Sequence, residues 1–188
     1  MKVRKFLFAG ALLVATLFSV NSVMAQTTDK VTVNLKFRPV QAIVVTSGTE
    51  VVDLVYATKT DYSNGKSETV NDHLEIFSMG GFEVKVNAAG DFTNGTNTKT
   101  IPVGDVQIVA TEGSQNGSGE ITFASKASLT TSANTLLSAT GGGTAIKYNV
   151  EYDNTDAGGS NKYFDKYIAA DGNESVYTTT VTYSIAAK

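Results

Sequence analysis

The stretch that decides the fold spans residues 72–87 and reads DHLEIFSMGGFEVKVN. Apolar and polar residues alternate before its Gly80-Gly81 pair, and the alternation resumes after that pair. Successive side chains of a strand point to opposite faces, so the pattern predicts a β-hairpin with one buried and one wet face. The buried face is predicted to carry Leu74, Ile76, Phe82, Val84 and Val86.

Alternation of the same kind predicts further strands on both sides of this stretch. Residues 28–37 place their apolar side chains on one face, and Pro39 ends that strand because proline has no N–H to donate. Residues 41–45 and 50–56 are predicted strands joined by a polar turn, the second buried on both sides except at Asp53. A loop is expected at residues 58–71. More strands are expected at residues 101–110, 121–123, 144–152 and 175–186, and a strand is favoured over a short helix within residues 125–140.

These segments predict an all-β fold, an antiparallel immunoglobulin-like β-sandwich of about 8–9 strands. Short polar turns join the strands, and no segment shows the period of an amphipathic helix. An eight-stranded closed barrel is the alternative architecture.

The first 25 residues have the pattern of a cleavable signal-peptide helix. Basic residues precede an apolar run, and Val23-Met24-Ala25 fits the small-x-small rule for cleavage before Gln26. We therefore expect a signal peptide at residues 1–25 and a single β-sandwich domain at residues 26–188. The protein is expected to be secreted, to the periplasm, the cell surface or the extracellular space.

Composition excludes several classes of function. Three of the 15 basic residues and none of the 18 acidic residues precede Gln26, so the chain from Gln26 onward has a net charge of −6. An acidic chain is a poor partner for nucleic acid. The chain contains no cysteine, which excludes disulfides, thiolate metal sites and cysteine nucleophiles.

No set of residues predicts an active site or a cofactor site. His73 is the single histidine, and its place near the start of a predicted strand indicates a surface residue. One histidine leaves no imidazole pair for a metal ion, and paired carboxylates of the glycosidase kind cannot be assigned. The protein is therefore predicted not to be an enzyme.

The long polar segment at residues 153–173 is the candidate ligand-binding region. Its acidic residues suggest calcium, but the spacing from Asp153 places Thr155, Ala157 and Phe164 where an EF-hand needs oxygen ligands. Its aromatic residues suggest stacking on sugar rings, or else filling of the core beneath the loop. The candidate ligand-binding residues are Tyr163, Phe164, Tyr167, Asp153 and Asp156.

Two short patterns resemble known families of exported proteins. Gly81-Phe82-Glu83-Val84 and Thr182-Tyr183-Ser184-Ile185 resemble the two motifs of the WxL family of bacterial cell-surface proteins, here without either tryptophan. Residues 177–183 resemble the terminal strand of chaperone-usher pilins and of spore-coat-U-like fimbrial subunits. The second resemblance implies that a strand near the N-terminus completes a neighbouring subunit, and residues 30–37 have the alternation of such a donor.

These observations favour a non-enzymatic bacterial protein, a structural or adhesive component of the cell surface or of an extracellular filament. Its expected partner is a cell-surface or extracellular polymer or protein. The edge strands predicted at residues 30–37 and 175–186 leave open whether it also self-assembles. The alternative is a soluble secreted glycan-binding module that uses residues 153–173. Of the two arrangements open to residues 30–37, we favour pairing within their own sheet over completion of a neighbour, because residues 37–40 form a natural bend.

Overall fold

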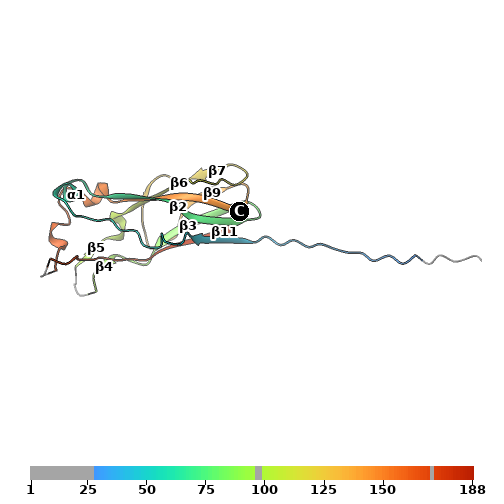
Figure 1. The fold of residues 1–188 in the computed structure, drawn as a ribbon, viewed down its shortest axis with the longest axis horizontal. Helices are drawn as coiled ribbons and strands as arrows, with labels where there is room; N and C mark the ends of the chain where they lie inside the picture. The colour runs from blue at the N-terminus through green and yellow to red at the C-terminus, as the bar shows by residue number, and fades with distance from the viewer. Residues whose placement is uncertain (1–27, 96–98, 170–171) are drawn as a thin grey trace, which may run out of the picture. The chain divides into compact units, whose positions relative to one another are not determined.

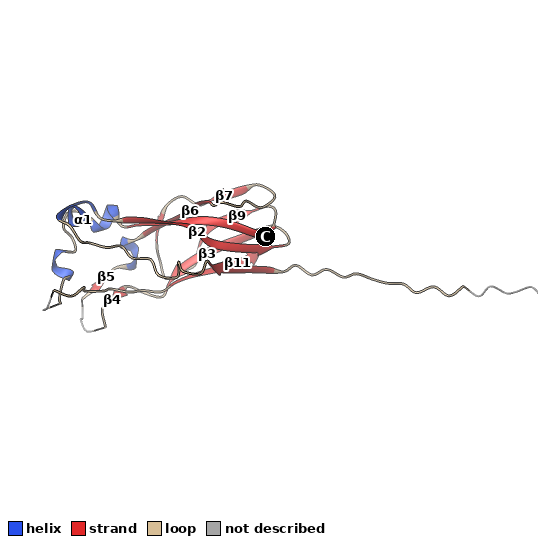
Figure 2. Ribbon diagram, viewed as in Figure 1, coloured by secondary structure: helices blue, strands red, loops and turns tan. Residues whose placement is uncertain are grey.

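The computed structural model describes residues 28–95, 99–169 and 172–188, and the predicted signal peptide lies outside these ranges. One compact unit comprises Phe37–Lys188. Figure 2 shows that it is built mainly of strands, with short helices gathered at one end. The strands are β1 (Gln41–Val45), β2 (Ser67–Ser78), β3 (Phe82–Ala88), β4 (Phe92–Thr93), β5 (Thr100–Ile101), β6 (Gln107–Glu112), β7 (Ile121–Phe123), β8 (Ala127–Ser128), β9 (Asn134–Ala139), β10 (Gly143–Asp153) and β11 (Val181–Ala187). The helices are α1 (Lys59–Asn64), η1 (Val103–Asp105), α2 (Thr155–Gly158) and η2 (Phe164–Lys166).

The strands form the predicted antiparallel β-sandwich. One sheet has the order β1-β2-β10-β6-β8, the other has the order β11-β3-β9-β7, and β4 and β5 form a small separate pair. The predicted core residues Leu74, Ile76, Phe82, Val84 and Val86 are all buried between the sheets. The prediction of the fold class is therefore confirmed.

The two strands of the decisive stretch do not form the predicted hairpin. β2 pairs with β1 and β10, whereas β3 pairs with β11 and β9 in the other sheet. The turn at Gly80-Gly81 thus carries the chain from one sheet to the other. Each strand buries its apolar face because the two faces meet across the sandwich, which the alternation alone cannot distinguish from pairing within one sheet.

Part of the strand order corresponds to that of an immunoglobulin sandwich, as far as strand F. In that fold one sheet has the order A-B-E-D, and the other places strand F between strands C and G. Here β1-β2-β10-β6 follows the first order, and β11 lies beside β3 in the place of strand F. No described strand lies on the outer side of β11, where strand G would be.

The two ends of the sandwich have different structures, which we call the base and the tip. At the base, Gln41 pairs with Ser78 close to the Gly80-Gly81 turn, and the Lys188 amide donates to the Gly81 carbonyl. At the tip, Asn64 and Gly159 form a bridge that joins α1 to α2. Figure 1 shows α1, β4 and β5 at the tip and the C-terminus at the opposite end.

Two predicted strands are not formed. Residues 28–40 contain no strand, and all of their side chains are exposed. Residues 50–56 contain no strand either, and from Val51 onward their side chains alternate between exposed and half-buried instead of being buried on both sides. Residues 30–37 are in no described strand, so the predicted pairing with their own sheet is not formed.

The prediction that His73 is a surface residue is also wrong, because His73 is buried. Between the pairs Tyr148–Leu74 and Val150–Val70, β10 advances by two residues and β2 by four, so β2 bulges around Asp72. Asp72 has a φ of 52°. The bulge turns the His73 ring inward, where Nε2 is 2.9 Å from the Tyr152 hydroxyl and Nδ1 is 3.0 Å from Thr49 Oγ1.

Elsewhere the predicted strands exist, but several of them begin or end at other residues than predicted. The favoured strand within residues 125–140 is confirmed by β8 and β9, and the strand expected at residues 144–152 is β10. The expected loop at residues 58–71 contains α1 and the start of β2. The expected strand at residues 175–186 begins only at Val181, preceded by extended chain with one bridge, from Thr178 to Thr93.

Candidate assembly site

The exposed N-terminal segment is the first part of the candidate site. Val31, Val33, Leu35 and Phe37 alternate along it, and each side chain is 80–86% exposed. Polar residues occupy the positions between them. Four large apolar side chains in strand register are unfavourable in water, and burial of each would contribute about 1.5–3 kcal/mol. This segment therefore has the side-chain pattern of a half-buried β-strand, although its apolar side chains are exposed.

The edge strand β11 is the second part, because its inner face is incompletely covered. Val181, Tyr183 and Ile185 pair with Ala88, Val86 and Val84 of β3 and face the same core. The three β3 residues are at most 4% exposed, whereas their β11 partners are half-buried. A strand on the outer side of β11 would cover this face and use its free backbone groups.

Residues 50–56 form a second unpaired edge. Val52 and Leu54 pack against the core, but no backbone hydrogen bond joins residues 50–56 to another described residue. Side chains connect Thr49, just before this segment, to β11. His73 Nδ1 is 3.0 Å from Thr49 Oγ1 and its Nε2 is 2.9 Å from the Tyr152 hydroxyl, which lies 2.5 Å from the Tyr183 hydroxyl. We call residues 50–56 and residues 175–187 the open edges.

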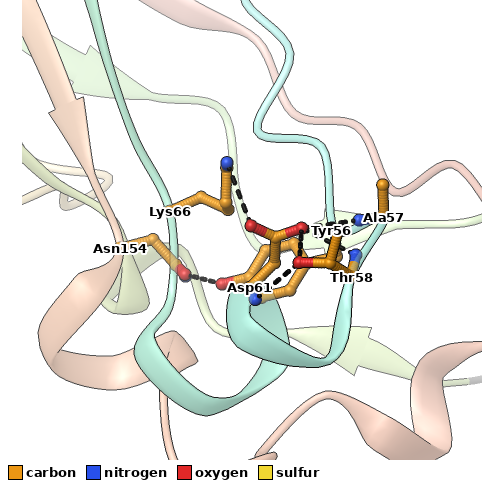
Figure 3. Close-up of polar contacts among 6 residues, drawn as sticks. All are labelled: Tyr56, Ala57, Thr58, Asp61, Lys66 and Asn154. Carbon is orange, nitrogen blue, oxygen red and sulfur yellow. Dashed lines mark hydrogen bonds and ion pairs between the residues drawn. The ribbon is translucent and has the colours of Figure 1, made fainter.

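Side chains at the tip hold residues 50–56 in place, although their backbone is not paired with a neighbouring strand. Figure 3 shows Tyr56 pointing at Asn154, and the Tyr56 hydroxyl donates to Asn154 Oδ1. Burial, with the nearby Asp61 charge, raises the pKa of Tyr56 to about 12, so this hydroxyl keeps its proton at neutral pH. The segment therefore ends at a fixed point although its backbone is unpaired.

The next residues fix the start of α1. The Asp61 carboxylate accepts hydrogen bonds from the backbone amides of Ala57 and Thr58 and from Lys66 Nζ, while the Thr58 hydroxyl caps the helix (Figure 3). Thr58 and Asp61 thus form a capping box. The hydrogen bonds from Thr58, with those from Lys66 and Ala57, lower the pKa of Asp61 to about 2. Thr58-x-x-Asp61 is a motif from which the sequence alone could have predicted α1.

An open groove of about 510 Å³ separates residues 48–53 from the free edge of β2. It is lined by polar residues with Val51, Val52 and Val70 among them, and Asp53 and Glu68 both lie on its wall. Burial of apolar side chains against two carboxylates is unfavourable. The apolar N-terminal segment thus fits the open edges better than this groove.

The five predicted ligand-binding residues do not form one site. Tyr163 is buried, and its hydroxyl donates to Asp105 Oδ2 and accepts from Asn154 Nδ2. Asp153 is buried and accepts a hydrogen bond of 2.7 Å from Lys126 Nζ. Phe164, Tyr167 and Asp156 are exposed.

The polar cluster around Tyr163 has a structural role that the sequence did not reveal. Lys162 Nζ also lies 2.7 Å from Asp105 Oδ2, so this carboxylate is paired with an ammonium and a phenol. Burial, followed by the hydrogen bond to Asp105, raises the pKa of Tyr163 well above its usual value. The cluster joins η1 to the segment before η2, and together with Tyr56 it holds the tip together.

The described residues contain no cluster of histidine or acidic side chains suited to a metal ion. No helix within them is long and apolar enough to cross a membrane. No protein-family model matches the sequence, and no curated protein matches it as a relative. The resemblances to WxL proteins and to fimbrial subunits therefore stay predictions.

Proposed function

We propose that this protein is an exported, non-enzymatic structural component of the bacterial cell surface or of an extracellular filament. In this proposal residues 31–37 of one copy add as a strand to the open edges of another copy. The partner is thus a second copy of the same chain, and adhesion to other surface polymers is a property of the assembled form. The export step rests on the signal-peptide pattern of residues 1–25.

One observation carries the proposal. The same chain has an exposed segment with four alternating apolar side chains and a sheet edge whose inner face is half-covered. In the immunoglobulin strand order, strand G lies on the outer side of strand F, whose place β11 takes here. A donor and an acceptor in one polypeptide predict self-association by strand addition.

Such a contact can propagate from one copy to the next. The donor surface and the acceptor surface are different parts of the molecule, so the interface is heterologous. Each added copy brings a new donor and a new acceptor, and a repeat that does not form a ring grows as a filament. This is the physical link from the two surfaces to a structural role outside the cell.

The test uses protein that begins at Gln26. Val33→Asp with Leu35→Asp places two charges on the apolar face of the donor, whereas Thr32→Asp with Asn34→Asp places them on the polar face. Size-exclusion chromatography with light scattering should show assemblies for the unmodified protein and for the polar-face variant. The apolar-face variant should elute as a single copy with an unchanged thermal transition.

A peptide of residues 28–38 provides the second half of the test. Added to the apolar-face variant, it should raise the melting temperature, because binding to the folded state stabilises by about 2.7 kcal/mol at a hundredfold excess over Kd. A peptide carrying Val33→Asp and Leu35→Asp is the matched control. The proposal is wrong if the unmodified protein stays a single copy at all concentrations and the peptide leaves the melting temperature unchanged.

A further inference from the structure

The direction of strand addition decides which ends of two copies face each other, and this inference rests on the proposed function. β11 runs toward the base, since its last residues lie beside Phe82 and Gly81. Strand G of an immunoglobulin sandwich runs antiparallel to strand F. An added segment in that place therefore runs toward the tip of the acceptor, and its Phe37 lies at the tip end.

The inward-facing residues suggest one register for this pair. Along residues 175–185 of the acceptor every second side chain is half-buried, and these are the odd-numbered positions. With Phe37 opposite Tyr177, Leu35 lies opposite Thr179, and Val33 lies opposite Val181. This register uses the tip half of the edge, which is favourable because β1 already lies beside β11 in the base half.

The linker between donor strand and sandwich is short. Arg38, Pro39 and Val40 alone separate Phe37 from Gln41, the first residue of β1. Consecutive residues span at most about 3.6 Å, so the Cα atoms of Phe37 and Gln41 are at most about 14 Å apart. Gln41 lies at the base of its own copy. The base of the donor copy must therefore lie close to the tip of the acceptor copy.

Both ends carry exposed apolar side chains that suit such a contact. At the tip, Phe164 is 78% exposed, and Tyr167 and Val176 are 50–58% exposed. The segments that carry them are joined, because the Tyr177 hydroxyl donates to the Lys166 carbonyl. At the base, Val40 and Met79 are each 52% exposed and are adjacent, since the Met79 amide donates to the Val40 carbonyl.

We infer that the filament has a second interface, in which Val40 and Met79 at the base of one copy pack on Phe164, Tyr167 and Val176 at the tip of the next. Exposed apolar groups of this kind mark interaction surfaces when they lie together. The contact fixes the angle between successive copies. It also buries the exposed aromatic residues of the tip against a second copy of this chain.

The chain has no cysteine, so disulfide trapping tests this contact directly. Protein that begins at Gln26 and carries Met79→Cys with Tyr167→Cys is allowed to assemble and is then oxidised. β2 has 12 residues and spans on the order of 40 Å, so the two cysteines of one copy cannot bond to each other. Non-reducing gels should show a ladder of covalent multimers.

Met79→Cys with Thr111→Cys is the matched control, because Thr111 is exposed but pairs with Asn149 near the middle of β10, away from both ends of the sandwich. It should give at least tenfold less ladder than the base–tip pair. A third variant adds Gly-Ser-Gly-Ser between Arg38 and Pro39 to the base–tip pair. It should still assemble by light scattering but should lose most of the ladder, because the longer linker frees the two ends.

The outcomes separate the two proposals. Assemblies that form without a ladder, or a ladder equal to that of the Thr111 control, would overturn the second interface and leave strand addition standing. Absence of any assembly, with the thermal transition of the variant intact, would overturn strand addition and the second interface with it. Unmodified protein run in parallel shows whether the cysteines themselves prevent assembly.

Discussion

Residues 31–37 and strand β3 have the same pattern and opposite environments. Each has apolar side chains at every second position, yet those of residues 31–37 are at least 80% exposed, while Phe82, Val84 and Val86 are at most 4% exposed. β3 has a hydrogen-bonded strand on each side, whereas residues 31–37 belong to no strand in the described part of the chain. Alternation thus tells which side chains share a face, but not whether the same chain supplies the sheet.

Phenylalanine truncation gives the largest expected difference between the two regions. Phe82→Ala should lower the free energy of unfolding by about 3–5 kcal/mol, because it removes a fully buried ring from the core. Phe37→Ala should leave the single copy unchanged and should weaken only assembly. Denaturant unfolding of both variants at a concentration too low for assembly measures the difference, and equal losses would show that residues 31–37 are part of the core.

The pH dependence of stability tests the buried His73 beside the bulge of β2, which the sequence pattern predicted to lie at the surface. Burial lowers the pKa of His73, so the unfolded chain binds the proton more tightly than the folded protein does. The stability from neutral His73 is therefore complete above the unfolded pKa of about 6.5 and is lost as the pH falls below it, by up to about 1.4 kcal/mol per pH unit.

The measurement is unfolding by denaturant between pH 7 and pH 5. His73 is the one histidine of the chain, so no other imidazole contributes in this window. Asp61, whose pKa is about 2, loses its contribution only at more acidic pH. His73→Gln should be independent of pH over the same range, and an equal slope in both proteins would mean that His73 is not the source.

Residues 50–56 have no backbone pairing, so the side chains of the capping box that follows them should contribute to the stability of the tip. Thr58→Ala should cost about 1 kcal/mol, the usual loss for an N-cap, because the Asp61 amide loses its acceptor. Thr60→Ala in the same helix is the control and should be close to neutral. Thermal unfolding compares them, and equal melting temperatures would mean that the α1 cap does not contribute to the stability of the tip.

Calcium is expected to have no effect on the melting temperature. Asp153 is already paired with Lys126, and Asp105 with Lys162, so neither carboxylate is free to bind a cation. The melting temperature should be the same in millimolar calcium and in chelator. A reversible rise of several degrees would contradict this and would point to calcium-dependent adhesion.

Most of the fold was predictable because its signals are local. The faces of residues 72–87 follow from period two, and the strands at residues 121–123 and 144–152 follow from their patterns. The sheet to which each strand belongs was not predictable. Gly80-Gly81 fits both a hairpin turn and a crossing between sheets, and only the distant partners β10 and β9 decide which forms.

The candidate site was predictable in part. Alternation predicts edge strands at residues 30–37 and 175–186, and β11 is an edge strand, but residues 30–37 form no strand. The unpaired state of residues 50–56 was not predictable, because VVDLVY has the composition of a buried strand. The role of Tyr163 depends on Asp105 and Asn154, which the fold brings to it from other segments. No local pattern distinguishes such a buried phenol from one that binds a sugar.

The crossing at Gly80-Gly81 also affects how far apart in the sequence the pairing strands lie. Because β2 and β3 do not pair with each other, each needs a partner from far along the chain, and β10 and β11 lie about 70 to 100 residues later than β2 and β3. Folds dominated by such distant pairings fold in milliseconds to seconds. β11 is the last described strand along the chain, so its open edge is available only after all of the preceding strands have been synthesised.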